Sequence, residues 1–159
     1  MGEPAVQELC AELIRFDTTN LGDGESRGER AAAEFVAEHL TDLGLTPTLL
    51  ERAPTRSNVI ARVPGADPSL PALLVQAHLD VVPADASEWS VPPFAGEIRD
   101  GFVWGRGAVD MKDMCATLLT VLSRWPAAGT VPRRDIVLAF VADEEDCGEF
   151  GRASCRERV

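Results

Sequence analysis

Two apolar runs in the chain each lead directly into polar residues, and this arrangement constrains the fold more than any other feature. The run ALLVQA (72–77) is followed by His78 and Asp80 in the sequence HLD, and the run DIVLAFV (135–141) is followed by the acidic sequence DEED (143–146). Continuous apolar runs of this length are typical of strands that are covered on both faces. We therefore expect two covered strands that carry polar residues at their carboxyl ends.

Helical periodicity predicts three helices around these strands. Apolar residues recur at three- and four-residue intervals over residues 6–14, 32–43 and 111–125, which is the spacing of amphipathic helices. The sequence SRGE (26–29) has the spacing of a capping box that would begin the second helix, and Gly44 would end it. Because helices alternate with covered strands, we expect the α/β class.

Shorter strand patterns fill the stretches between these elements. TPTLLE (46–51) and SNVIARV (57–63) have the composition of strands. EIRDGFVWG (97–105) is expected to form a hairpin, because Asp100 and Gly101 supply the two positive-φ residues of a tight turn. The sequence contains no internal repeat, no low-complexity tract and no recognisable domain linker.

Charge and composition narrow the set of partners. Fifteen Lys and Arg against 26 Asp and Glu leave a formal charge of −11, which repels phosphate backbones and anionic lipid surfaces. We expect neither nucleic acid nor a membrane as a partner. The first twenty residues carry acids where a signal peptide needs basic residues, and no apolar run is long enough to span a bilayer, so we expect a cytoplasmic protein.

The four cysteines are widely scattered and include no C-x-x-C pair. Cys10 and Cys115 are expected to act as small apolar residues in helix faces. Cys147 follows the acidic cluster, but we interpret it as an ordinary loop residue because oxygen-rich cation sites rarely recruit a lone thiolate.

Three separate segments bring histidine and carboxylates toward one edge of the predicted sheet, where ligands of open α/β sheets bind. These residues are His78, Asp80, Asp110, Glu144 and Glu145. In an extended chain His78 and Asp80 point to the same side, so Asp80 can accept a hydrogen bond from the imidazole nitrogen that does not hold a metal. Glu144 and Glu145 are neighbours whose side chains diverge in an extended chain, so that one can hold a metal while the other holds a water.

Each of these residues also has a purely structural interpretation. Taken alone, the acidic run 143–146 would be a solvated turn, His78 a satisfied polar residue, and Asp110 the cap of the following helix. The sequence GRGAVD (105–110) also resembles the start of a dinucleotide-binding loop. Its sixth position is Asp110 instead of glycine, and a carboxylate there would repel a pyrophosphate.

Several motifs, in order and spacing, resemble a known family. They are ALLVQAHLDVVPAD, then Trp89 with PPFAGEIRDGFVWGRGAVDMKD, then VLAFVADEEDCGEFG, together with LIRFDTTN near the start. They are similar to the co-catalytic di-zinc hydrolases that include acetylornithine deacetylase, succinyl-diaminopimelate desuccinylase, aminoacylase and related carboxypeptidases. The resemblance spans about residues 6–151. It implies a three-layer α/β domain, incomplete in this chain, with a mostly parallel central sheet and helices on both faces.

The resemblance also implies a metal centre of two zinc ions, with cobalt or manganese as possible substitutes. His78 would bind one zinc, Asp110 would bridge both, and Glu145 would bind the other. The peptide bond between Asp110 and Met111 would be cis.

The implied reaction is the zinc-dependent hydrolysis of an amide bond in an N-acyl amino acid or small peptide. Asp80 would orient His78, and Glu144 would be the general base that takes a proton from the attacking water.

Parts of the family pattern are missing from the sequence. The family supplies a further acidic ligand and a late histidine, whereas the remaining histidine here, His39, lies in the second predicted helix. We expect residues 1–151 to be the N-terminal part of the catalytic domain and RASCRERV (152–159) to be a truncation artefact or foreign sequence. The lid domain, through which the family forms homodimers, would be absent. The chain alone would then be inactive, and a non-catalytic fragment of the same fold is the alternative.

Overall fold

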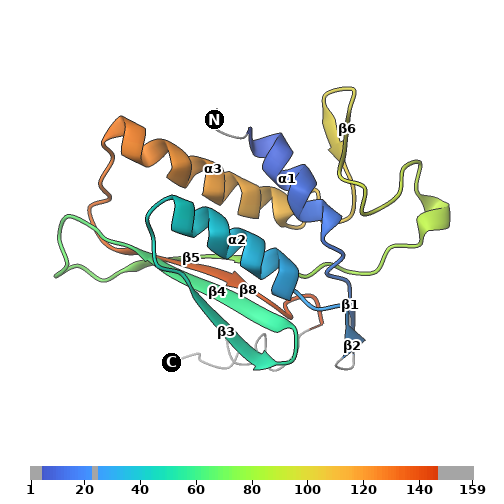
Figure 1. The fold of residues 1–159 in the computed structure, drawn as a ribbon, viewed down its shortest axis with the longest axis horizontal. Helices are drawn as coiled ribbons and strands as arrows, with labels where there is room; N and C mark the ends of the chain where they lie inside the picture. The colour runs from blue at the N-terminus through green and yellow to red at the C-terminus, as the bar shows by residue number, and fades with distance from the viewer. Residues whose placement is uncertain (1–4, 23–24, 147–159) are drawn as a thin grey trace.

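The computed structural model describes residues 5–22 and 25–146. Its main elements are three helices and a four-stranded sheet (Figure 1): α1 Val6–Arg15, α2 Arg30–Asp42, α3 Lys112–Ala128, β3 Thr48–Ala53, β4 Arg56–Val63, β5 Leu73–His78 and β8 Ile136–Val141. Short elements complete the fold: β1 Asn20–Gly22, β2 Glu25–Ser26, the 3-10 helix η1 Ala86–Glu88, β6 Glu97–Arg99 and β7 Phe102–Trp104. None of the helices in this part of the chain has the length and apolar character that a membrane crossing needs.

The central sheet has the strand order β3-β4-β8-β5 and is mixed. β4 runs antiparallel to both β3 and β8, whereas β5 and β8 are parallel. The α/β class is confirmed, but the expectation of a mostly parallel sheet is wrong for the described residues, because a short turn joins β3 directly to β4. The parallel pair is the one that matters for the site, since its register sets His78 opposite Val141 and brings both carboxyl ends to one edge.

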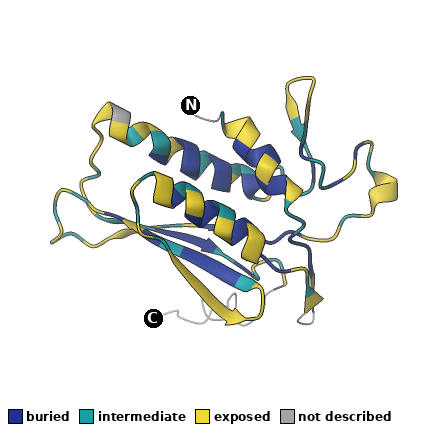
Figure 2. Ribbon diagram, in the orientation of Figure 1, coloured by how far each residue is buried: buried dark blue, intermediate teal, exposed yellow. Residues whose placement is uncertain are grey.

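All three helices lie on the same face of the sheet (Figure 1), so the described residues provide two layers instead of the expected three. Helices α2 and α3 contact strands β4 and β5 respectively, and α1 packs on α3. The expectation that the run ALLVQA is covered on both faces is also wrong here, because the described helices cover only one face of the sheet. Leu73 and Leu74 are half exposed, and every residue of β3 on the opposite edge is exposed (Figure 2).

The core lies between the helices and the sheet and confirms most of the predicted helix faces, although Val6 and Met114 are exposed. Its buried members include Leu9, Leu13, Ile14, Val36, Leu40, Val59, Leu79, Leu119, Leu122, Leu138 and Phe140. Cys10 and Cys115 are buried free thiols, as expected. Burial raises their pKa values to about 11 and about 12, so both remain protonated at neutral pH. Cys147 lies outside the described residues.

Helix α2 begins without the capping box that the sequence suggests. Ser26 lies in β2, and its hydroxyl accepts a hydrogen bond from the N–H of Gly28 at 3.0 Å. The N–H groups of Glu29 and Arg30 instead donate to the carbonyl of Thr55, at 2.9 and 3.0 Å. The prediction was wrong because the turn between β3 and β4, remote in sequence, provides the acceptor.

The carboxylate of Glu29, at the start of α2, is fully buried. Arg56 Nε lies 3.2 Å from Glu29 Oε2, yet neither carboxylate oxygen has a hydrogen-bond partner among the described residues. Burial raises the pKa of Glu29 to about 7, and the positive charge of Arg56 opposes this shift. Glu29 and Arg56 therefore form a buried contact in which the charge of Glu29 changes near neutral pH.

The loop before β6 lies directly against α1. Arg15 donates hydrogen bonds to the carbonyls of Ala95 and Gly96. Gly96 has a φ of +56°, and a Cβ on it would lie 2.1 Å from the carbonyl oxygen of Ala11. In the hairpin itself, Asp100 and Gly101 have φ values of +55° and +82°, which confirms the predicted turn.

We predict that Gly96→Ala destabilises the protein much more than Gly101→Ala. Gly101 shares the positive φ but has nothing within 4 Å of an added Cβ. Gly101→Ala should thus lower the unfolding free energy only by the strain of a positive φ, about 1–2 kcal/mol. Gly96→Ala should lower it by about 1–3 kcal/mol more because of the clash with Ala11. Urea denaturation of the two variants gives the difference, and equal losses would contradict the close approach to α1.

We also predict that replacing Glu29 by Gln changes the pH dependence of stability. With its pKa raised from 4.5 to about 7, folded Glu29 binds more protons than the unfolded chain in this interval. Its stabilising contribution is fully present below pH 4.5 and is lost as the pH rises through 7. The unfolding free energy of the wild type minus that of Glu29→Gln should fall by about 2–3 kcal/mol between pH 4.5 and 7.5. A pH-independent difference in denaturant titrations would refute the shift.

Candidate metal centre

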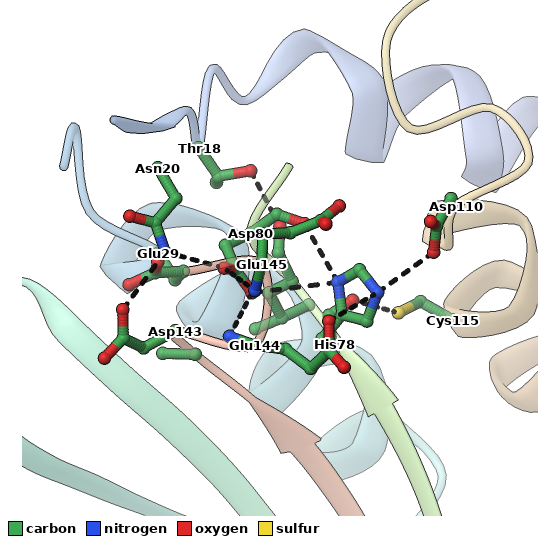
Figure 3. Close-up of polar contacts among 12 residues, drawn as sticks. Thr18, Asn20, Glu29, His78, Asp80, Asp110, Cys115, Asp143, Glu144 and Glu145 are labelled. Atoms are coloured by element: carbon green, nitrogen blue, oxygen red, sulfur yellow. Dashed lines mark hydrogen bonds and ion pairs between the residues drawn. The ribbon is translucent and has the colours of Figure 1, made fainter. Parts of the chain in front are cut away.

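Three of the residues that the sequence singled out meet at the carboxyl edge of the sheet (Figure 3). His78 is the last residue of β5, Asp110 lies in the turn between β7 and α3, and Glu145 lies in the turn that follows β8. One ligand atom from each residue lies within 4.8 Å of the others. The structure therefore brings together the three side chains that the resemblance implies as metal ligands.

The imidazole of His78 is buried, and each of its two nitrogens lies near an oxygen atom. Its Nδ1 lies 3.0 Å from the backbone carbonyl of Asp80, and its Nε2 lies 3.1 Å from Asp110 Oδ1. Because a carbonyl only accepts hydrogen bonds, Nδ1 carries the proton and the lone pair of Nε2 faces the carboxylates. The thiol of Cys115 also donates to the backbone carbonyl of His78 at 3.4 Å.

The carboxylate of Asp80 has a different set of partners from the one expected. It lies 3.7 Å from His78 Nδ1, beyond hydrogen-bond distance, and the backbone carbonyl of Asp80 holds the imidazole instead. The fully buried carboxylate accepts hydrogen bonds from the backbone N–H groups of Glu144 and Glu145, at 3.1 and 3.0 Å, and from Asn20 Nδ2 at 3.0 Å. The strand periodicity used for the prediction ends at His78, so the side chain of Asp80 turns toward the loop after β8.

Glu144 and Glu145 lie in a turn, so the extended chain assumed for them is not what the structure contains. Asp143, just before them, has a φ of +67°. Glu144 is half exposed, with Oε2 3.8 Å from His78 Nε2. Glu145 is partly buried, and this burial raises its pKa, an effect that the neighbouring His78 opposes. Glu144 therefore lies near Nε2 of His78, and a carboxylate oxygen of Glu145 lies within 4.8 Å of an imidazole nitrogen.

The donor set fits a divalent cation such as zinc, cobalt or manganese, all of which accept imidazole nitrogen together with carboxylate oxygen. The 3.1 Å between His78 Nε2 and Asp110 Oδ1 is close to the roughly 3.3 Å that separates two ligands on a tetrahedral zinc with bonds of about 2.0 Å. The side chain of Asp110 is 75% exposed, so the cluster is open to solvent. The peptide bond between Asp110 and Met111 is cis, as the resemblance predicts.

Several residues that support the cluster were not singled out from the sequence. Asn20 donates to both Asp80 and Asp143, each at 3.0 Å, and Asn58 Oδ1 accepts from the N–H of Ala142 at 2.7 Å. Arg56 also pairs with Asp143. Single polar residues of this kind carry no periodic signal, and only the tertiary structure brings them together.

The other histidine lies outside the cluster, as expected. His39 is in α2, where its Nδ1 lies 2.9 Å from the carbonyl of Phe35 and its ring lies against the ring of Phe35, 4.2 Å between centroids.

The family model described as "Peptidase family M20/M25/M40" matches residues 74–157 of the chain. Among curated relatives, the N-fatty-acyl-amino acid synthase/hydrolase PM20D1 of Mus musculus is 35% identical over 153 residues, covering 92% of this chain and 30% of the relative. Aminoacylase-1 of Sus scrofa is 37% identical over 122 residues, which cover 76% of this chain and 30% of the relative. Succinyl-diaminopimelate desuccinylase of Methylorubrum populi is 44% identical over 151 residues, which cover 91% of this chain and 37% of the relative. The chain thus spans about a third of the length of these relatives.

Solved structures of the same family share the fold. The M20 metallo-carboxypeptidase Sso-CP2 of Sulfolobus solfataricus has a TM-score of 0.74 at 22% identity, over 89% of this chain and 31% of the other. The YXEP protein of Bacillus subtilis, described as a dinuclear metal-binding peptidase of the M20 family, has a TM-score of 0.59 at 16% identity, over 97% and 41%. The family resemblance inferred from the sequence motifs is confirmed, and the chain belongs to peptidase family M20/M25/M40, a lineage of amidohydrolases.

Proposed function

We propose that the natural protein carrying this sequence hydrolyses an amide bond in an N-acyl amino acid or a small peptide, using two divalent cations, with zinc as the first choice. The observation that carries the proposal is the convergence of His78, Asp110 and Glu145 within 4.8 Å at the carboxyl ends of β5 and β8. Relatives whose names describe an aminoacylase, a desuccinylase and an N-fatty-acyl-amino acid hydrolase support this substrate class.

In this proposal three side chains hold the cations. His78 binds through Nε2, because its Nδ1 is occupied by the carbonyl of Asp80. Asp110 would be shared by the two cations, and Glu145 would bind the second cation. Bound there, a zinc ion would polarise the substrate carbonyl and lower the pKa of a nearby water molecule toward neutrality.

Glu144 is the proposed general base. Its carboxylate is half exposed, and its Oε2 lies 3.8 Å from His78 Nε2, so it borders the cluster from the open side. Its backbone is fixed by Asp80. Glu144 accepts a proton from the attacking water as the water oxygen bonds to the amide carbon. It then returns that proton to the departing nitrogen as the C–N bond breaks.

We predict that in the natural protein Glu144→Gln loses turnover but keeps its metal, whereas His78→Ala loses the metal itself. Glu144→Gln should keep its zinc but lose turnover by about 10²- to 10⁴-fold, since it removes a base and not a ligand. His78→Ala should lose metal. Metal content and hydrolysis of a panel of N-acyl amino acids and dipeptides are measured side by side. His39→Ala on α2 and the exposed Glu38→Gln are matched controls that should behave as the wild type. Near-normal turnover by Glu144→Gln would overturn the mechanism.

We further propose that the 159 residues do not complete the site. Residues 5–22 and 25–146 provide three ligand side chains for two cations, which gives each cation fewer than the three protein ligands that a catalytic zinc usually has. The 159-residue chain by itself should therefore show no measurable amidase activity on the same panel. Robust zinc-dependent turnover by this chain would show that its own residues suffice.

A further inference from the structure

The loop that carries Glu144 and Glu145 is shaped by side chains from other parts of the chain. The N–H of Ala142 donates to Asn58 Oδ1 at 2.7 Å, and the N–H groups of Glu144 and Glu145 donate to the carboxylate of Asp80. No helix or strand includes residues 142–146. The direction of the two glutamates therefore depends on what holds this loop.

Asp143 is the strained point of the loop. Its φ of +67° costs a non-glycine residue about 1–2 kcal/mol, so the surrounding contacts must impose it. Its carboxylate accepts hydrogen bonds from Asn20 Nδ2 at 3.0 Å and from Arg56 Nη2. These two donors fix the residue that immediately precedes Glu144.

Arg56 joins this loop to a rigid part of the fold. Its side chain is only 14% exposed, and it uses different nitrogens for two carboxylates: Nη2 for Asp143, and Nε for Glu29, 3.2 Å away. Glu29 is in turn fixed at the start of α2, where its backbone N–H donates to the carbonyl of Thr55. The guanidinium thus spans the distance between the start of α2 and the loop after β8.

We propose that Arg56 is a positioning residue for the metal centre: by clamping Asp143 against Glu29, it sets the backbone from which Glu144 and Glu145 reach the cations. This inference rests on the proposed function, in which Glu144 is the base and Glu145 a ligand. Removing the clamp would leave the buried Glu29 and Asp143 without their shared counter-charge.

An ion pair that only stabilised the fold would make the same contacts. The test must therefore separate a loss of folding stability from a change in the position of Glu144 and Glu145. Arg56→Lys keeps the charge, but a single nitrogen cannot reproduce the two-pronged contact. Asp143→Gly removes the anchoring carboxylate and also the cost of the positive φ, so it should loosen the loop without a matching loss of stability. Arg62→Lys is the matched control, since Arg62 lies on the same strand and pairs with Asp135 away from the cluster.

Three readouts are compared in the natural protein. The first is hydrogen exchange of the Glu144 and Glu145 amides without metal, the second is zinc affinity by competition with a chromophoric chelator, and the third is kcat and KM. We expect faster exchange at these two amides in Arg56→Lys and Asp143→Gly, and zinc affinity or kcat lowered by about 10- to 100-fold. KM should change little in both variants, the thermal midpoint should change little in Asp143→Gly, and Arg62→Lys should match the wild type.

Unchanged exchange, zinc affinity and kcat in Asp143→Gly would overturn the inference, as would exchange that accelerates evenly along the whole chain in both variants. If Arg56→Lys fails to fold, Asp143→Gly decides alone. A wild-type protein that neither binds zinc nor hydrolyses the panel would refute the proposed function. In that case, local exchange at Glu144 and Glu145 still supports or overturns the positioning role.

Discussion

The carboxylate of Asp80 is the interaction on which the polar edge of the sheet depends. It is fully buried, and a buried carboxylate is tolerated only when its oxygens are hydrogen-bonded. Its partners are the amides of Glu144 and Glu145 and the side chain of Asn20, which belong to different segments of the chain. The side chain of Asp80, after β5, thereby determines the path of the loop after β8. The backbone carbonyl of Asp80 also orients His78. Losing one of these hydrogen bonds would leave the buried carboxylate less well satisfied, which explains why the loop adopts a defined turn despite its four adjacent acids.

The charges around this edge divide into a buried layer and an open layer. In the buried layer, Arg56 lies between the carboxylates of Glu29 and Asp143 and compensates them incompletely. In the open layer, Glu144 and the 75% exposed Asp110 lie beside a single imidazole. Negative charge therefore exceeds positive charge throughout the edge. Since like charges a few ångströms apart repel one another strongly in a partly buried site, the arrangement favours a divalent cation in the open layer.

The elements with strong local periodicity could be predicted from the sequence. The helix stripes, the hairpin at Asp100 and Gly101, and the two apolar runs that end in polar residues all appear in the structure, because each signal lies within one short segment. The failures involve contacts between distant segments. Thr55 supplies the acceptor at the start of α2, and the carbonyl of Asp80 replaces its carboxylate beside the imidazole. The mixed sheet likewise depends on how the strands pair, which residue patterns along a single strand do not specify.

The same distinction separates the candidate metal ligands, which their sequence context predicts, from the residues that hold them in place, which it does not. His78, Asp110 and Glu145 have side chains with recognisable chemistry and lie close to the ends of predicted elements. Asn20 and Arg56 act through hydrogen bonds that span 60 or more positions in the sequence, to Asp80 and to Asp143. A ligand must be a particular residue type because the cation requires it, whereas a supporting residue need only fill the donor or acceptor position that the fold leaves open. The identity of the supporting residues is therefore a property of the packed structure, and it becomes visible only when the loop after β8 is seen against α2 and β4.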